Sequence, residues 1–393
     1  MSARCWQTWD TTDPQPATCN LSFVIRIFFL ALLATAASAQ TPHIAPAAHP
    51  PQLTPLAYSV AGRTLAAPST DPRFGAQALN YQWPGTYFEA AFSGTAVFFA
   101  TGPGNEILHI TLDRQPPIPL VKPAPGAYQI TGLAAGSHTI RIDVITESQA
   151  APDTFLGFAL PPGEAPLTPP HRTRQIEFIG DSHTVGYGNT SPTRDCNESQ
   201  VWATTDSSQS FAALVARHYD ADDQNNSISG HGIVRNYNGA PGDPVPVAWP
   251  YVLLDKKNLY NDPHWRPEVI VIALGTNDFS TPLHAGEPWK TRAQLHADYE
   301  ATYLRFLQTL RARNPQAYFI LWATDMADGE IASEESKVVD AWKATGEKRV
   351  AFLAIPGLQF TACNFHPSLA DDRTIATRLE QIIEAVPNVW QSR

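Results

Sequence analysis

The sequence lacks a dense cluster of lysine and arginine, and its formal net charge is −10 over 393 residues. A protein that binds the phosphate backbone of nucleic acid needs a basic surface, so we expect no nucleic-acid partner. The same charge disfavours strong attraction to anionic membranes but suits a neutral substrate such as a sugar ester. Charged residues make up only 16% of the chain and hydrophobic residues 43%, which excludes global disorder and allows a packed core.

Long hydrophobic runs are also missing. The longest N-terminal run, residues 27–34, follows Arg26 and is too short to span a bilayer, which takes about 20 residues. Ala37-Ser38-Ala39 after it has the small-residue pattern of a signal-peptidase site. We therefore predict a signal peptide over residues 1–39, secretion or export to the periplasm, and no stable membrane insertion.

Cysteine is scarce, with four residues in the whole chain. Cys5 and Cys19 would be removed with the signal peptide, which leaves Cys196 and Cys363 in an oxidising compartment. They either form a disulfide or remain as two buried thiols. Two cysteines alone do not make a closed zinc site, and we predict no metal and no cofactor.

The length suits two domains. Residues 40–56 are rich in proline and alanine and are predicted to be a linker. In residues 57–162, hydrophobic and polar residues alternate over 108–112 and 140–144, with glycine and proline between the runs. Alternation of period two indicates strands with one buried face, so this region is predicted to be a β-sandwich of the jelly-roll kind. The proline-rich stretch 160–170 is predicted to be the interdomain linker.

The pattern changes in residues 171–393. Continuous hydrophobic runs at 176–179, 269–274, 318–323 and 350–355 are typical of parallel strands that are covered on both faces. Helical patterns separate them, including a stripe at Leu295, Tyr299, Tyr303, Phe306 and Leu310. This alternation predicts an α/β domain with a doubly wound parallel sheet, in which ligands bind beyond the carboxyl ends of the strands.

Four short segments lie just after such strands or close to them. They are Gly180-Asp181-Ser182, Ser229-Gly230, Gly275-Thr276-Asn277-Asp278 and Asn364-Phe365-His366-Pro367. A serine nucleophile needs a histidine to take its proton, and the oxyanion that forms needs preorganised N–H donors. We expect Ser182 as nucleophile, His366 as base, and the Ser182 amide, the Gly230 amide and the Asn277 side chain as donors. No G-x-S-x-G is present, which argues against an α/β-hydrolase nucleophile elbow.

These four segments resemble the signature blocks of the SGNH (GDSL) hydrolases. A closer resemblance, over residues 57–388, is to carbohydrate esterase family 2, and it rests on several further segments: 187–189, 229–237, 363–368, 62–63, 83–85, 132–138 and 154–158. The resemblance implies a jelly roll joined to a flavodoxin-like SGNH domain. It also implies removal of O-acetyl groups from polysaccharides or oligosaccharides such as xylan and glucomannan. We expect the protein to act as a monomer.

One position departs from the SGNH pattern. Many of these enzymes have an aspartate three residues before the histidine, and here that residue is Cys363. His366 would then be oriented by a backbone carbonyl within the segment Asn364-Phe365, by the Asn364 side chain, or by a distant carboxylate among Asp325, Asp371 and Asp372. We favour a Ser–His dyad with a backbone acceptor. A neutral acceptor stabilises imidazolium less than a carboxylate does, so we expect modest turnover and a pH optimum that is not acidic.

Other side chains near these segments receive supporting roles. Asp181 and Asp278 are expected to be structural acceptors, and His183, His231 and His284 to be loop residues. Trp249 and Trp289, each beside a proline, are candidates for stacking on a sugar ring. Two other functions stay open: a general short-acyl or lipid esterase, and a carbohydrate-binding protein without catalysis.

Overall fold

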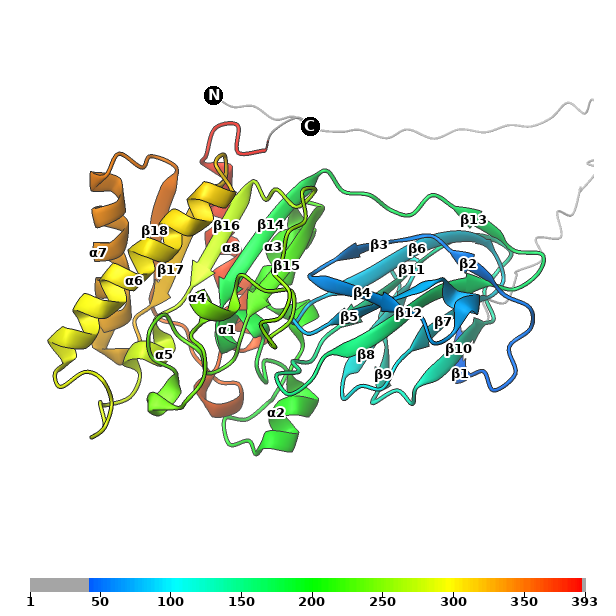
Figure 1. The fold of residues 1–393 in the computed structure, drawn as a ribbon, viewed down its shortest axis with the longest axis horizontal. Coiled ribbons are helices and arrows are strands. Elements are labelled where there is room, and N and C mark those ends of the chain that lie inside the picture. Colours follow the sequence, from blue (N-terminus) through cyan, green and yellow to red (C-terminus); the bar gives the residue numbers. More distant parts are fainter. Residues whose placement is uncertain (1–41, 391–393) are drawn as a thin grey trace, which may run out of the picture. The chain divides into compact units, whose positions relative to one another are not determined.

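The computed structural model describes residues 42–390, and Figure 1 shows their fold. The predicted signal peptide, with Cys5 and Cys19, lies outside the described residues, as do residues 40 and 41 of the predicted linker. Between residues 42 and 390, no helix is long and hydrophobic enough to cross a membrane.

The N-terminal half of the described chain is an antiparallel β-sandwich, as the alternating pattern predicts. One sheet has the order β1 (His43–Pro46), β10 (Gly126–Thr131), β7 (Val97–Thr101), β12 (Asp153–Leu160), β5 (Gln77–Tyr81) and β4 (Thr64–Pro68), with β2 (Thr54–Leu56) paired to β12. The other has the order β13 (Ala165–Leu167), β6 (Tyr87–Gly94), β11 (Gly136–Val144), β8 (Ile107–Leu112) and β9 (Ile118–Val121), with β3 (Tyr58–Ala61) paired to β6. The hydrophobic residues of the alternating runs, such as Ile110 and Ile142, fill the core between the sheets.

The predicted linker over residues 40–56 is wrong, because β1 and β2 belong to the sandwich. β1 pairs with β10 at the edge of its sheet, and β2 pairs with β12. The interdomain stretch likewise contains β13, which pairs with β6. Proline cannot donate to a ladder, so it is tolerated on edge strands, and a proline-rich composition therefore hid three short strands.

The C-terminal half is a five-stranded parallel sheet with helices on both faces, which confirms the predicted fold class. Its order is β15 (Ala221–Ser227), β14 (Arg174–Gly180), β16 (Val269–Ala273), β17 (Tyr318–Thr324) and β18 (Val350–Ile355), the flavodoxin-like order 2-1-3-4-5. Its helices are α1 (Ser182–Val185), α2 (Glu198–Thr204), α3 (Phe211–His218), α4 (Val245–Ala248), α5 (Thr276–Phe279), α6 (Arg292–Arg313), α7 (Glu330–Ala344) and α8 (Leu369–Glu384).

The residues of each strand alternate between two hydrophobic cores. Ile270 and Leu321 pack with α6 and α7 on one face, and Val271 and Trp322 pack with α3 and α8 on the other. Both faces of the sheet are therefore dry, which is why its strands are continuous hydrophobic runs. Figure 1 shows these two helix pairs flanking the strands.

Strand β15 is the exception, and sequence reasoning missed it. Its residues are Ala-Asp-Asp-Gln-Asn-Asn-Ser, yet most of them are buried. Several of its polar side chains bond to partners from the sandwich and the sheet, whereas Asn225 Oδ1, Asn226 Oδ1 and Ser227 Oγ are buried without a partner among the described residues. The Arg63 guanidinium, fully buried, donates to Gln224 Oε1 at 3.3 Å and to Glu177 Oε1 at 3.2 Å, and Asn226 donates to the same Glu177 oxygen at 2.7 Å. A polar network thus joins the two domains at β15. Because this strand has no hydrophobic run, the hydrophobic pattern did not predict it.

Candidate active site

The nucleophile segment forms the turn between β14 and α1. β14 ends at Gly180, and Asp181 caps α1 by accepting the His183 amide at 3.0 Å. A side chain at position 180 would collide with Thr184 Oγ1, so glycine is required for the turn to close. Ser182 is the first residue of α1 and is 4% exposed. The serine therefore sits at the carboxyl end of the first strand, where the fold rule predicts a site.

His366 lies against Ser182. Its Nε2 is 2.8 Å from Ser182 Oγ, although 184 positions separate the two residues. The Tyr187 ring stacks on the imidazole with centroids 4.2 Å apart, and the His183 ring meets it edge-on at 5.5 Å. This enclosure lowers the pKa of His366 to about 4, against a smaller raising effect of its hydrogen bonds to backbone carbonyls. The imidazole is therefore neutral, as a general base must be, from mild acid upward.

Backbone carbonyls hold the other nitrogen of His366. Its Nδ1 lies 2.9 Å from the Cys363 carbonyl oxygen and 3.1 Å from the Asn364 carbonyl oxygen. The Asn364 side chain instead points to Tyr187 Oη at 3.5 Å, and Phe365 is 58% exposed. Of the three arrangements open from the sequence, the structure therefore has the backbone acceptor, which fixes the Nδ1–H tautomer and leaves Nε2 free to accept the serine proton.

The three distant carboxylates serve other purposes. Asp325 accepts the Gly357 amide, and Asp372 accepts the Phe211 amide and the Asn189 side chain. Asp371 accepts the Gln359 and Phe360 amides at 2.8 and 3.0 Å and caps α8 through Ser368. Asp371 therefore tethers the loop that precedes His366 without facing the imidazole.

Two of the predicted oxyanion donors are free. Within residues 42–390, the backbone amides of Ser182 and Gly230 have no hydrogen-bond acceptor. Gly230 has φ +83°, and no atom lies within 4 Å of the place where a β-carbon would be, so glycine is favoured there by its backbone conformation and not by crowding. The Asn277 amide is already bound, to the His231 carbonyl at 2.9 Å and to Asp181 Oδ2 at 3.2 Å. To serve as a third donor, it would have to exchange one of these bonds.

Buried acceptors hold the Gly230 loop from two sides. Asp278 accepts the amides of Ile233, Val234 and Arg235 at 2.9–3.0 Å, which is the structural role expected of it. From the sandwich, Glu147 Oε1 accepts the Ser229 amide at 2.8 Å. Burial raises the pKa of Asp278 to about 6 and that of Asp181 to about 7. The oxyanion side of the site thus depends on residues from both domains.

Cys196 and Cys363 form a disulfide. Cys363 is fully buried, directly beside Gly188 of the nucleophile segment. The bond joins the segment before α2 to the turn Cys363–Phe365 that precedes His366.

The prediction that Trp249 stacks on substrate is wrong. Trp249 is 2% exposed, and its indole donates to Glu177 Oε1 at 2.7 Å beneath the Arg63 guanidinium. A buried indole with a satisfied N–H has no free face for a sugar. Trp289 is half-buried, packs against the core of α6 and α7, and donates to Asp298.

Two exposed aromatic residues, Tyr237 and Phe365, lie within the motif segments, and sequence reasoning did not single them out as candidates for stacking on a sugar. Tyr237 is 55% exposed, and its amide donates to the Gly230 carbonyl at 2.8 Å. Phe365 adjoins His366 in sequence. The only available signal was their position within the second and last motif segments.

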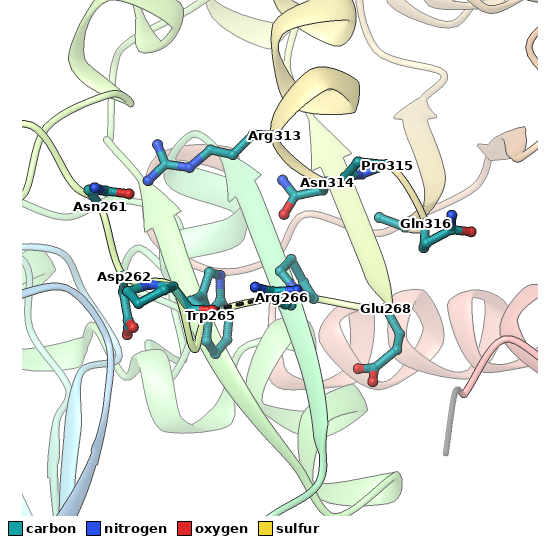
Figure 2. Close-up of a pocket in the computed structure, with 12 residues that line it drawn as sticks. Asn261, Asp262, Trp265, Arg266, Glu268, Arg313, Asn314, Pro315 and Gln316 are labelled. Carbon is teal, nitrogen blue, oxygen red and sulfur yellow. Dashed lines mark hydrogen bonds between the residues drawn. The ribbon is translucent and has the colours of Figure 1, made fainter. Parts of the chain in front are cut away.

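A cavity of about 750 Å³ lies away from Ser182 and His366. Figure 2 shows its lining, which includes Asp262, Trp265, Arg266, Arg313 and Gln316. These residues precede β16 and β17, so the cavity is at the amino edge of the sheet, opposite the dyad.

Comparisons with known proteins match both halves of the chain. Residues 72–170 match the family model described as Carbohydrate esterase 2 N-terminal, and residues 178–382 match the GDSL-like Lipase/Acylhydrolase family. An acetylxylan esterase / glucomannan deacetylase of Cellvibrio japonicus is 42% identical over 338 residues, which are 86% of this chain and 93% of that protein.

Solved structures agree. A carbohydrate esterase structure, described as displaying divergent catalytic and non-catalytic binding functions of its active site, has a TM-score of 0.80 and 41% identity. It covers 86% of this chain and 100% of its own. A family two carbohydrate esterase from Clostridium thermocellum in complex with cellohexaose has a TM-score of 0.71 and 27% identity, over 84% of this chain and 98% of its own.

Proposed function

Because the chain belongs to carbohydrate esterase family 2, with a GDSL-type catalytic domain, we propose that it is an exported O-deacetylase of polysaccharides of the xylan and glucomannan type. The chain is a carbohydrate esterase by its relatives.

In the mechanism, Ser182 Oγ attacks the carbonyl carbon of the acetyl ester while His366 Nε2 takes the hydroxyl proton. The carbonyl oxygen becomes an oxyanion and accepts hydrogen bonds from the free amides of Ser182 and Gly230. The C–O bond to the sugar then breaks, and imidazolium returns the proton to the sugar oxygen. Water repeats the sequence on the acetyl-enzyme, with His366 again as base, and releases acetate and free Ser182.

One observation carries this mechanism: the 2.8 Å contact between His366 Nε2 and Ser182 Oγ, with Nδ1 held by two carbonyls. A base within hydrogen-bond reach of the nucleophile, oriented from behind, is the arrangement that acyl transfer requires. Neutral carbonyls stabilise imidazolium less than a carboxylate does, so turnover is modest.

The substrate follows from the names of the relatives and from the surface around the dyad. Tyr237 and Phe365 are exposed; the Tyr237 amide bonds to the Gly230 carbonyl, and Phe365 directly precedes His366 in the chain. An aromatic face binds the apolar face of a sugar ring, so these two rings would position the acetylated sugar. Trp289 stays a candidate for a more distant sugar unit.

The predicted signal peptide over residues 1–39 and the disulfide support the proposed compartment. A disulfide persists in secreted and periplasmic proteins, and a polysaccharide substrate is met outside the cytoplasm. We propose that the enzyme acts there as a monomer.

The test is acetate release from acetylated xylan, acetylated glucomannan and p-nitrophenyl esters of two to eight carbons, for wild type and Ser182→Ala. We expect release from both polysaccharides, a preference for the two-carbon ester, and a loss of about 10⁴-fold or more in the variant. Full activity of Ser182→Ala would exclude the acyl-enzyme, and a preference for eight carbons would point to a lipid esterase. Binding of polysaccharide without acetate release would indicate a carbohydrate-binding protein.

A further inference from the structure

The turn that orients His366 is conformationally unfavourable. Asn364 and Phe365 have φ of +51° and +62°, both in the left-handed region that residues with a side chain rarely adopt. This conformation turns the Cys363 and Asn364 carbonyls toward the imidazole Nδ1. Such a turn persists only where its surroundings hold it.

Two residues of one neighbouring segment hold this turn. Cys196 is bonded to Cys363 through the disulfide. The Arg194 carbonyl accepts the Asn364 amide at 2.6 Å, so the turn is fixed at two consecutive residues.

The Arg194 side chain holds the approach to the turn. Its guanidinium donates to the Phe360 carbonyl at 2.8 Å and to the Gln359 carbonyl at 2.7 Å, and it covers the Phe365 ring at 4.9 Å. Arg194 therefore contacts the chain on both sides of Cys363.

The disulfide also contacts the nucleophile segment. A methyl group at Gly188 would lie 2.4 Å from Cys363 Cβ and 2.8 Å from its Sγ, so the chain after Ser182 packs directly on the bonded cysteine. Cys363 thereby fixes the distance between the nucleophile segment and the turn that carries the base.

We propose that Arg194, Cys196 and Cys363 form a positioning clamp that replaces the missing carboxylate of the catalytic histidine. The clamp holds the carbonyls of Cys363 and Asn364 against Nδ1, so that Nε2 faces Ser182. None of its side chains touches the substrate, and they act only through His366. The proposal rests on the proposed function, because it assumes the Ser182–His366 dyad.

The first test removes the covalent part of the clamp with the double variant Cys196→Ala/Cys363→Ala in the full chain. We expect kcat for p-nitrophenyl acetate to fall about tenfold or more, with KM little changed, because misplacement of a base by a fraction of an ångström affects the chemical step. We also expect the downfield proton resonance of the His366 Nδ1–H to broaden or disappear. Thermal unfolding measures the accompanying loss of stability separately.

The second test removes the guanidinium contacts of the clamp with Arg194→Ala, which keeps the disulfide and the backbone carbonyl that accepts the Asn364 amide. The same pattern of lower kcat, unchanged KM and weakened Nδ1–H resonance is expected, at a smaller size. Reduction of the wild type with dithiothreitol should lower kcat and reoxidation should restore it. The double variant, which lacks the disulfide, is the control and should not respond.

The outcomes separate the two proposals. If both clamp variants kept kcat within twofold of wild type with an unaltered Nδ1–H resonance, the clamp would be overturned while the dyad stood. If Ser182→Ala stayed active, the dyad itself would fail, whatever the clamp variants showed. A loss of stability with unchanged kcat would make the disulfide a structural bond only, and would overturn the clamp as well.

Discussion

The two sides of the active site are held in different ways. On the oxyanion side, the Gly230 loop is held by non-covalent contacts, among them hydrogen bonds to Asp278 and, from the sandwich, to Glu147, and the ion pair of Arg235 with Glu287. On the histidine side, Asp371 makes the equivalent bonds to the loop before His366, and a disulfide and Arg194 are added. Residues 228–236, which include Gly230, contain no non-glycine residue with positive φ, whereas the histidine turn has two. The stronger restraint is thus found where the backbone is less favourable.

The largest difference in activity is expected between variants of Asp278 and Asp371, the two carboxylates that tether these loops. Asp278→Asn places an NH2 group against backbone amides and should release the Gly230 loop, with a loss of about 100-fold in kcat/KM. Asp371→Asn makes the same chemical change on the histidine side, where the clamp remains, and should cost less than about tenfold. Steady-state kinetics with p-nitrophenyl acetate measures both, and equal losses would contradict the difference between the sides.

On the histidine side, the fall of kcat/KM at low pH is expected to follow the protonation of His366. Because enclosure lowers the pKa of His366 to about 4, the base is neutral above that pH and becomes protonated as the pH falls through it. The value of kcat/KM should stay near its plateau at pH 5 and fall about tenfold by pH 3, at one decade per pH unit. An unperturbed histidine, with a pKa of about 6.5, would already cost about 30-fold at pH 5.

Buried histidines limit the pH range of this experiment. Burial lowers the pKa of His183 to about 3 and that of His366 to about 4 in the folded protein. The unfolded chain therefore binds more protons, so the stability of the fold declines as the pH falls below the unfolded value of about 6.5. The loss continues until the pH reaches the two folded pKa values. Circular dichroism at each pH therefore has to show that the protein is still folded. An acid limb centred near pH 6.5 in folded protein would refute the predicted shift.

A smaller effect should come from the sandwich. Glu147→Ala removes the acceptor of the Ser229 amide next to Gly230, and we expect kcat to fall several-fold to about tenfold. Glu164→Ala is a matched control, because Glu164 Oε1 also accepts a backbone amide in the sandwich, that of Thr95 at 2.9 Å, but on β13's side of the domain. If neither variant changed kcat, the sandwich would only pack on the catalytic domain.

The smallest effect is expected from a methyl group at Gly230. The space is open, so Gly230→Ala should cost only the left-handed backbone penalty of about 1–2 kcal/mol in stability and a few-fold in kcat. Gly346→Ala is the control, since Gly346 also has positive φ and open space but follows α7. Equal losses of stability with a kcat loss only at Gly230 would show that its amide serves catalysis.

The sequence alone determined the architecture and identified the candidate nucleophile and base. The alternating runs of the sandwich and the continuous runs of the parallel sheet follow from which faces are buried. Parallel strands bring their carboxyl ends to one edge, so motifs after strands 176–179 and 269–274 had to meet, and the segments of Ser182 and Asn277 do, through the bond from Asn277 to Asp181.

The tertiary structure decided what patterns along the chain do not encode. The polar side chains of strand β15 have partners from both domains, such as Arg63 and Glu177, and Trp249 is buried in the core beneath Arg63, which lies 186 positions away in the chain. The orientation of His366 depends on backbone carbonyls. Every residue has one, so no side-chain motif could predict this orientation. Only the conformation of residues 363–366, held by contacts with residues 194 and 196, placed those carbonyls against the imidazole.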